Sequence, residues 1–412
     1  MSDPRPRLAI TLGDVAGIGP EIVVRAVTQP DVMTWCRPVI IGHPELVRRT
    51  ARSLGIVLEL EEHEFDSTNR IVCCNPGTDD VLDIVPGCIQ AAAGRAAYDY
   101  LVAATRATLR GEFNAIVTAP LHKEALRAAG VPYPGHTEIL AAECGIGEVA
   151  MMLYLPADDS HIDALASPAP SPPASGERVG VRGRPRTSTS ADSAPDAHPA
   201  ERPAPSPYPS PPQTGARGPN QILSLANSLG VAHVTLHTSI RSVPGLLTTA
   251  RVADTVRLLD RFLRDLGGEP RIGVTALNPH AGEHGLFGDE EGTIIAPAVE
   301  LCRREGINAT GPIPADALIR RAVAGEFDGV AAMYHDQGHI PLKLIGRDRA
   351  VNVTLGLPII RTSPSHGTAF DIVGQGTANP EGLLAAMRVA CRLAGRWQDL
   401  RPARVDPHGC PR

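Results

Sequence analysis

The sequence has few aromatic residues and little net charge. Only 3% of its 412 residues are Phe, Trp or Tyr, although 43% are hydrophobic, so the core has to be built mainly from Val, Leu, Ile and Ala. The formal net charge of -6 argues against the basic face that nucleic-acid binding requires. An acidic chain can still bind a small anion in a locally cationic pocket.

Cysteine pairs with metal-binding spacing and long apolar runs are also missing. The eight cysteines include no CxxC pair, and adjacent Cys73 and Cys74 do not have a metal-ligand spacing. No run approaches the ~20 apolar residues that a membrane helix needs. The first residues, MSDPRPRLAITLGD, lack the apolar segment of a signal peptide. We therefore expect reduced thiols and a cytoplasmic protein.

One break in composition interrupts the chain, at residues 168–219. This segment holds 14 of the 39 prolines and contains no Leu, Ile, Phe, Met, Cys or Lys. It can bury too little apolar surface to offset the entropy of ordering, so we expect a disordered, partly polyproline-like insertion. The fold should tolerate it, because loop-closure entropy grows only with the logarithm of loop length. A Pro-rich arm that binds a partner is the alternative.

Elsewhere, apolar runs that end in Gly-rich or His-rich loops alternate with helical patterns. This alternation predicts an α/β protein with a mostly parallel, buried sheet. In such sheets, ligands bind at the carboxyl ends of the strands. The predicted strands lie within residues 7–14, 37–43, 113–120, 270–280 and 327–338, and the predicted helices within 20–29, 44–55, 91–112 and 251–267.

Three motifs near strand ends carry candidate ligand-binding residues. GDVAGIGPE, Gly13 to Glu21, follows a predicted strand, and its glycines allow close backbone approach to a ligand. The nucleotide fingerprint GxGxxG is absent, and a tight turn explains the motif equally well. TAPLHKEAL, at 118–126, and YPGHTEIL, with His136 and Thr137, could bind a carboxylate or a phosphate, or could be solvated loops.

Three histidines each follow an apolar strand. They are His237 in HVTLHTS, His280 in ALNPHAGEHG and His335 in AMYHDQGH. The carboxyl ends of parallel strands converge, so three neutral imidazoles could meet and bind Zn²⁺, Co²⁺ or a similar ion. His284 and His339 stay open as alternative ligands.

The last third of the chain holds the most distinctive stretch, residues 352–380. It contains Arg361 followed by a loop rich in Gly, Ser and Thr, and Lys343 lies shortly before it. These two cations could bind the anionic ends of a substrate. A long structural connection is the alternative for the loop.

In this order, the motifs resemble the 4-hydroxythreonine-4-phosphate dehydrogenase family. The resemblance covers essentially the whole chain except the insertion. The segment SHGTAFDIVGQGTANP, at 365–380, is also similar to the adenine-ribose loop of isocitrate and isopropylmalate dehydrogenases. The resemblance implies their two-domain α/β fold, which is not a Rossmann fold. It implies one subdomain of roughly residues 1–125 plus 295–412, another of 126–294, and an active-site cleft between them.

The resemblance also implies roles for individual residues. Val15 is a departure, because the family usually has Pro there. The implied metal ligands are His237, His280 and His335; the substrate contacts are His136, Thr137, Lys343, Asn352 and Arg361; the catalytic set is Asp316, Asp336 and Lys343; and the dinucleotide contacts are His366, Gly367, Thr368, Ala369, Asp371 and Asn379.

The implied activity is oxidation of 4-phosphooxy-L-threonine by NAD⁺ with one divalent metal ion (Zn, Mg or Co), followed by decarboxylation to 3-amino-2-oxopropyl phosphate in pyridoxal phosphate biosynthesis. Asp371 favours NAD over NADP, because its charge would repel an additional phosphate. The family's active site forms at a dimer interface, so a homodimer is implied.

Other functions are open at this point. A sister dehydrogenase for 4-phospho-D-threonate, D-erythronate 4-phosphate or a related cyclic diol acid would keep the same motifs. A phosphate acyltransferase would share the fold, but it would lack the three histidines and the HGTAFDI segment. A non-catalytic scaffold that displays the Pro-rich arm is a third alternative.

Overall fold

The computed structural model describes residues 3, 5–62, 70–147, 149–157, 228–346 and 349–400, without the side chains of 396–400. The insertion predicted at 168–219 lies outside these residues. The described residues belong to one compact unit. No helix among them is long and apolar enough to cross a membrane.

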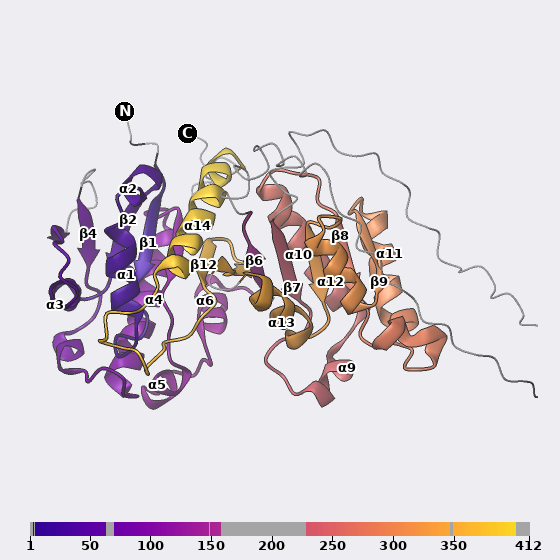
Figure 1. Cartoon of the computed structure of the whole chain (residues 1–412), viewed down its shortest axis with the longest axis horizontal. Helices are drawn as coiled ribbons and strands as arrows, with labels where there is room; N and C mark the ends of the chain where they lie inside the picture. The colour runs from indigo at the N-terminus through magenta and orange to yellow at the C-terminus, as the bar shows by residue number, and fades with distance from the viewer. Residues whose placement is uncertain are drawn as a thin grey trace, which may run out of the picture. The chain divides into compact units, whose positions relative to one another are not determined.

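A mixed, mostly parallel β-sheet organises this unit (Figure 1). Its strand order is β3-β4-β2-β1-β5-β12-β11-β6-β7-β10-β8-β9, and only the pairs β12–β11, β11–β6 and β6–β7 are antiparallel. A Rossmann sheet has the order 3-2-1-4-5-6, so this is a different topology. The strands are β1 Arg7–Thr11, β2 Arg37–Ile41, β3 Leu60–Glu62, β4 Ile71–Cys74, β5 Ala115–Thr118, β6 Ala150–Leu155, β7 Leu229–His233, β8 Ile272–Thr275, β9 Ala309–Ile313, β10 Gly329–Ala332, β11 Val351–Leu355 and β12 Ile360–Pro364.

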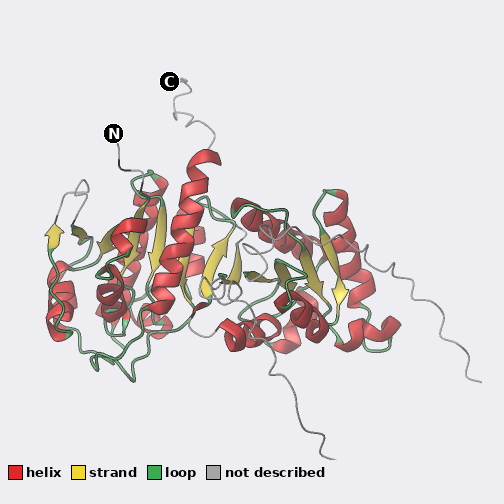
Figure 2. Cartoon of the chain, turned by 45° about the horizontal axis from the view of Figure 1, so that its top comes forward, coloured by secondary structure: helices red, strands yellow, loops and turns green. Residues whose placement is uncertain are grey.

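Helices lie on both faces of this sheet (Figure 2). Every residue of β5, β8, β10 and β12 is buried, as expected for parallel strands covered on two sides. The helices of eight or more residues are α1 Gly19–Val27, α3 Pro44–Ser53, α4 Ala91–Leu109, α6 His136–Cys144, α10 Thr249–Asp265, α11 Ala296–Arg304, α12 Ala315–Val323, α13 His335–Gly346 and α14 Glu381–Leu400.

The remaining helical elements are short. They are α2 Val32–Trp35, η1 Asp79–Asp83, α5 Lys123–Ala128, η2 Ile240–Ser242, α9 Val243–Leu246, η3 Pro279–Gly285 and η4 Glu291–Ile295.

The predicted α/β class and mostly parallel sheet are confirmed. All five predicted strands and all four predicted helices are present, with ends shifted by a few residues. The core consists mainly of Val, Leu, Ile and Ala side chains. The predicted division into 1–125 plus 295–412 and 126–294 stays a prediction; in the sheet, β9 and β10 lie beside β8 and β7 rather than beside the N-terminal strands.

Local sequence explains where the functional helices begin. Helix α6 starts directly after Gly135 and ends at Cys144, before Gly145, which adopts the left-handed conformation (φ 67°) that favours glycine. Helix α10 is capped by Thr248, whose side chain accepts a hydrogen bond from the Arg251 amide. The first residue of α6 is His136, so this glycine-bounded helix places a predicted substrate ligand.

Candidate active site

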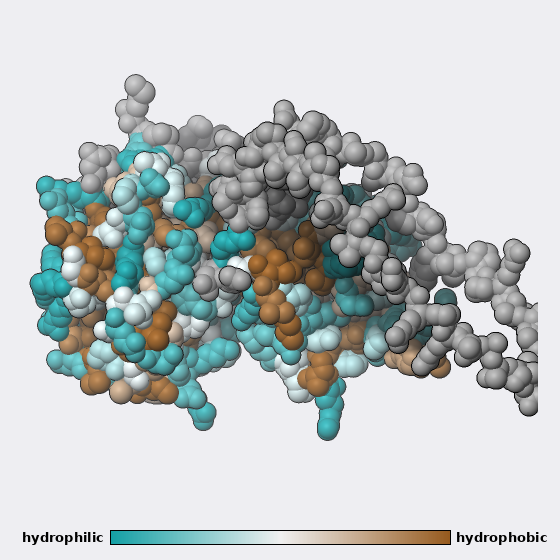
Figure 3. Space-filling model, in the orientation of Figure 1, coloured by the Kyte–Doolittle hydropathy of each residue, from teal (hydrophilic) through white to brown (hydrophobic). Residues whose placement is uncertain are grey.

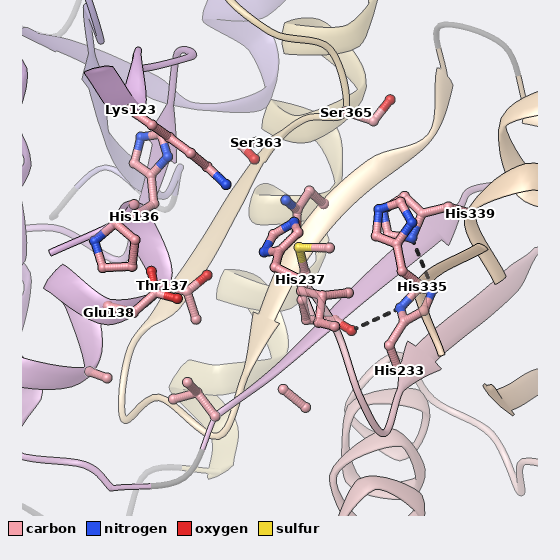
Figure 4. Close-up of a pocket in the computed structure, with 18 of the residues that line it drawn as sticks. Lys123, His136, Thr137, Glu138, His233, His237, His335, His339, Ser363 and Ser365 are labelled. Atoms are coloured by element: carbon pink, nitrogen blue, oxygen red, sulfur yellow. Dashed lines mark hydrogen bonds between the residues drawn. The ribbon is translucent and has the colours of Figure 1, made fainter. Parts of the chain in front are cut away.

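A cavity of about 820 Å³ collects most of the predicted site residues (Figure 4). Residues of the loops after β5, β7 and β12, of strands β6, β11 and β12, and of helices α6 and α13 form most of its wall. Of the predicted residues, the cavity is lined by His136, Thr137, His237, His335, Lys343, Asn352, Arg361, His366 and Gly367.

Arg361 is a buried cation on the wall of this cavity. Its side chain is among the largest fully buried ones, and its guanidinium donates to the hydroxyl of Thr118, at 2.7 and 3.2 Å, and to that of Thr354, at 3.1 Å. Among the described residues it has no carboxylate partner. Burial lowers the pKa of Arg361 to about 9, so it stays charged at neutral pH. A buried, unpaired cation that borders a cavity is suited to binding an anion.

Other polar groups around Arg361 also suit an anionic, hydroxylated ligand. Burial, with a smaller effect of the nearby Arg361 charge, holds the pKa of His136 well below its ordinary value, so this imidazole is neutral. The side-chain oxygen of Asn352 is buried and has no hydrogen-bond partner among the residues that the structure describes, which leaves one acceptor for a ligand. Lys123, from the candidate motif TAPLHKEAL, lines the same cavity, and so does Arg251, which the sequence did not single out as a site residue.

The loops after β7, β10 and β8 lie side by side, because these three strands are parallel neighbours. The side chain of Gln337 links two of these loops: its amide donates to the Ala276 carbonyl, and its oxygen accepts from the Thr275 hydroxyl and the Met333 amide. Gln337 thereby fixes the start of α13, where His335 is the first residue.

His237 and His335 lie together, with ring centroids 5.8 Å apart. Nδ1 of His335 is 2.6 Å from the carboxylate of Asp336, so it donates there and leaves Nε2 as the acceptor, which is the tautomer of a metal ligand. Burial, with Lys123 and His335 nearby, lowers the pKa of His237. Both rings therefore have the chemistry of a divalent-metal site.

The third predicted ligand, His280, is not brought into this arrangement. It does not line the cavity, and its ring lies 6.3 Å from that of Phe287. Among the described residues, no three His, Cys, Asp or Glu side chains are close enough to hold a metal ion. The arrangement therefore fits two imidazole ligands of the predicted three.

The loop that carries His280 has an unusual backbone. Residues 280–284 all have positive φ, between 43° and 75°, which is strained for the four that are not glycine. The buried carboxylate of Glu291 holds the start of this loop by accepting from the backbone amides of Leu277 and Asn278, at 2.8 and 2.7 Å, and from the Asn278 side chain at 3.1 Å.

We expect Glu291→Ala to lower the free energy of unfolding by about 3 kcal/mol, because it leaves buried donors without a partner. Urea unfolding measures this change. The control is Glu300→Ala, which removes an exposed ion pair with Arg304 and should change the free energy by less than about 1 kcal/mol. Equal effects of the two substitutions would show that Glu291 does not hold the loop.

The predicted dinucleotide loop packs against the GDVAGIGPE turn, a pairing that the sequence did not predict. The Ile18 amide donates to the Thr368 carbonyl at 3.0 Å, and the Ala378 amide donates to the Glu21 carboxylate at 3.0 Å. A Cβ at Gly17 would lie 2.7 Å from the Thr368 carbonyl oxygen, so only glycine permits this approach. The turn thus supports the loop next to the cavity.

The other predicted residues of this loop occupy different settings. His366 lines the cavity, and its buried Nε2 has no partner within the described part of the chain; Ala369 has a positive φ of 44°. Asp371 is exposed, and Asn379 caps the first turn of α14 by accepting from the Glu381 amide. Their role in binding a dinucleotide stays a prediction.

Two predicted catalytic residues lie off the cavity wall. Asp316 is an exposed residue in the first turn of α12, and Asp336 is exposed but accepts the hydrogen bond from His335. Conversely, His233 and His339 line the cavity, and His233 was not among the residues predicted from the sequence. For His339 the available signal was the four-residue spacing in HDQGH, which places it one helical turn after His335; His233 ends a strand, so its spacing from His237 carries no such signal.

Comparison with known proteins identifies the family. The family model described as pyridoxal phosphate biosynthetic protein PdxA matches residues 34–158 and 213–390. The chain belongs to the PdxA family. Membership in it makes the protein an enzyme of the oxidoreductase class, as the sequence predicted, and favours a dehydrogenase over an acyltransferase or a scaffold.

Individual relatives carry two different names. A 4-hydroxythreonine-4-phosphate dehydrogenase of Geobacter metallireducens is 38% identical over 96% of this chain and 97% of its own length. A D-threonate 4-phosphate dehydrogenase of Salmonella typhimurium is 37% identical over 94% of this chain and 98% of its own. The crystal structure of 4-hydroxythreonine-4-phosphate dehydrogenase from Klebsiella pneumoniae matches with a TM-score of 0.70 and 34% identity, covering 94% of this chain and 99% of that one. The PdxA family thus includes relatives with two substrate assignments at similar distance.

Proposed function

We propose that this protein is an NAD-dependent, divalent-metal-assisted dehydrogenase of phosphorylated hydroxy acids that works in the cytoplasm. The observation that carries the proposal is the buried guanidinium of Arg361, which has no carboxylate partner among the described residues and borders a cavity that Lys123, Lys343 and Arg251 also line. A substrate with a phosphate at one end and a carboxylate at the other would neutralise this set of cations.

The first candidate substrate is 4-phosphooxy-L-threonine, after the relatives named 4-hydroxythreonine-4-phosphate dehydrogenase. Its secondary alcohol would give a hydride to NAD⁺, and the resulting β-keto acid would lose CO₂ to form 3-amino-2-oxopropyl phosphate. The second candidate is 4-phospho-D-threonate or D-erythronate 4-phosphate. The names of several relatives favour this second candidate. The cavity wall also favours it, because cations outnumber carboxylates there: among the described residues that line the cavity, Glu138 is the only acidic one.

The described residues would bind and orient this substrate. Arg361, Lys343 and the neutral His136 would hold its anionic ends, while Asn352 would accept a hydrogen bond from a substrate hydroxyl. His366 and Gly367, which line the cavity, would belong to the loop that binds the dinucleotide. A metal ion held by His237 and His335, with His280 as the predicted third ligand, would polarise the substrate oxygen when bound.

Release of CO₂ tests the complete proposed reaction. With carboxyl-labelled substrate and NAD⁺, we expect labelled CO₂ and NADH in equal amounts. NADH without CO₂ would restrict the activity to the oxidation, and labelled CO₂ without NADH would refute the dehydrogenase. The same assay with NADP⁺ is expected to be slower.

We also propose a homodimer whose interface lies beside the cavity. Helix α13 exposes Ile340, Leu344 and Ile345, and its position in Figure 1 coincides with a hydrophobic patch in Figure 3. The same helix carries His335 and Lys343 on the cavity side. An apolar patch next to the site suits a second copy of the chain.

We expect Leu344→Asp to halve the molecular mass measured by light scattering after gel filtration, because Leu344 is 75% exposed and a carboxylate there would be buried in the dimer. The matched control is Val57→Asp, at an apolar residue that is 93% exposed in a loop, and it should leave the mass unchanged. A monomeric wild type would refute the proposed dimer.

A further inference from the structure

Two buried histidines form a hydrogen-bonded pair behind His335 (Figure 4). His233, the last residue of β7, is 3% exposed, and His339 in α13 is 6% exposed. Nε2 of His233 lies 3.0 Å from Nδ1 of His339. Gly338 makes this approach possible, because a Cβ there would lie 2.5 Å from Nε2 of His233.

The hydrogen bonds fix the tautomers of both rings. Nδ1 of His233 lies 3.3 Å from the backbone carbonyl of Met151, which can only accept, so this nitrogen carries the hydrogen. In a neutral ring, Nε2 of His233 is then the acceptor, and Nδ1 of His339 donates to it. The one hydrogen of a neutral His339 is thereby used, and its Nε2 keeps a lone pair.

Both rings are buried, and the hydrogen bond between them is complete when each ring is neutral, because one nitrogen then donates and the other accepts. An additional proton would place a charge inside this buried pair, which costs free energy. His339 is therefore suited to accept a hydrogen bond from a ligand without taking its proton.

The lone pair of His339 belongs to a ring that lines the cavity. The ring stacks on that of His335, with centroids 3.8 Å apart and planes 10° from parallel, so its orientation is fixed. No described residue donates a hydrogen bond to its Nε2. A donor on a ligand would complete this acceptor.

The charges around His339 favour a neutral donor over a cationic one. Lys343 lies one helical turn after His339 in α13, and both residues line the cavity. The ammonium of Lys343 would repel a ligand ammonium at His339, whereas it would not repel a hydroxyl. Glu138, the acidic residue of the described lining, lies on the side of His136 and Thr137 in Figure 4, away from His339.

We propose that His339 binds the substrate by accepting a hydrogen bond at Nε2 from a substrate hydroxyl. This hydroxyl occupies the position at which 4-phosphooxy-L-threonine has its ammonium group. His233 is the positioning residue that holds the required tautomer of His339. The site then prefers phosphorylated hydroxy acids, such as 4-phospho-D-threonate, over the corresponding amino acids. This inference rests on the proposed dehydrogenase function and specifies its substrate class.

The test compares wild-type enzyme with His339→Phe, which keeps the stacking on His335 but removes the acceptor. We expect kcat/KM of the metal-loaded variant to fall by about 10- to 100-fold with 4-phospho-D-threonate, the range for one lost hydrogen bond in a buried site. With 4-phosphooxy-L-threonine it should change much less. His339→Gln, whose amide oxygen can replace Nε2, should recover most of the loss. Equal losses on both substrates would assign His339 a structural role and overturn the proposal.

Two further measurements separate this inference from its alternatives. Metal content should be the same in wild type and His339→Phe; loss of the ion would make Nε2 a metal ligand and overturn the proposal. Calorimetric binding of the two acids covers the case of an enzyme that forms no NADH. In that case, the proposed function is refuted, but this inference is supported if His339→Phe binds 4-phospho-D-threonate more weakly than the wild type does and binds 4-phosphooxy-L-threonine equally well. Unchanged binding of both acids would refute both proposals.

The role of His233 has a spectroscopic signature. In protein labelled with ¹⁵N-histidine, the resonances that are present in the wild type and absent in His339→Phe belong to His339. In the wild type, these resonances should show a hydrogen on Nδ1. In His233→Leu this preference should be lost, and kcat/KM with 4-phospho-D-threonate should fall in parallel. An unchanged tautomer in His233→Leu would show that His233 does not position His339.

Discussion

Arg361→Met should lower kcat/KM for a phosphorylated hydroxy acid by about 30-fold to several thousandfold, because removal of one partner of a buried charge pair costs about 2–5 kcal/mol. The same substitution should leave the thermal stability of the ligand-free protein unchanged or raised. It removes a buried cation that has two threonine hydroxyls but no carboxylate as partners among the described residues. Stability and activity should thus change in opposite directions, as measured by calorimetry and steady-state kinetics.

The matched control is Arg271→Met, which should show the opposite behaviour. Arg271 forms an ion pair with the buried Asp328, at 3.1 Å, outside the cavity. Arg271→Met leaves that carboxylate with less compensation, so it should destabilise the fold by about 3–5 kcal/mol and leave kcat/KM of the folded enzyme nearly unchanged. If Arg361→Met destabilised the protein as strongly and left kcat/KM intact, Arg361 would be a structural residue.

His237→Ala and His335→Ala should each lower the affinity for a divalent metal ion by at least about 100-fold, since even the loss of an outer partner of a metal ligand costs 10- to 100-fold. Metal-stimulated NADH formation should fall with it. Metal content after dialysis and the rate at saturating metal measure the two effects. His43→Asn is the control, because Asn can cap helix α3 as His43 does, away from the cavity.

His280→Ala decides the third ligand. If the predicted three-histidine site is correct, His280→Ala should lower the metal affinity by the same factor as His237→Ala, although the described structure does not place His280 beside the other two histidines. Unchanged metal affinity in this variant would limit the site to His237 and His335. Unchanged affinity in all three variants would refute the metal site itself.

The sequence predicted the strands and helices well because their signals are local. A buried parallel strand such as β8 or β10 needs a short apolar run, and the amphipathic pattern of α10 continues over its full length. The adjacency of the loops that carry His237 and His335 could also be predicted, because parallel neighbouring strands end at the same edge of the sheet.

The hydrogen-bonded pair of His233 and His339 could not be predicted in this way. These residues lie 106 positions apart, and their contact depends on the close approach of α13 to β7 at Gly338. The burial of Arg361 is equally non-local, since Thr118, one of its partners, comes from a strand 243 residues earlier. Such contacts are set by the packing of elements that the sequence predicts only one at a time.

The most direct test of the account is the rate of NADH formation by purified, metal-loaded protein with NAD⁺ and either 4-phosphooxy-L-threonine or 4-phospho-D-threonate. The unphosphorylated acids serve as controls. The account predicts NADH only with phosphorylated acids, formed faster with 4-phospho-D-threonate, because the cations of the cavity require the phosphate and His339 prefers the hydroxyl. A folded, metal-loaded protein that forms no NADH with either phosphorylated acid, or forms it equally well without the phosphate, would contradict the account.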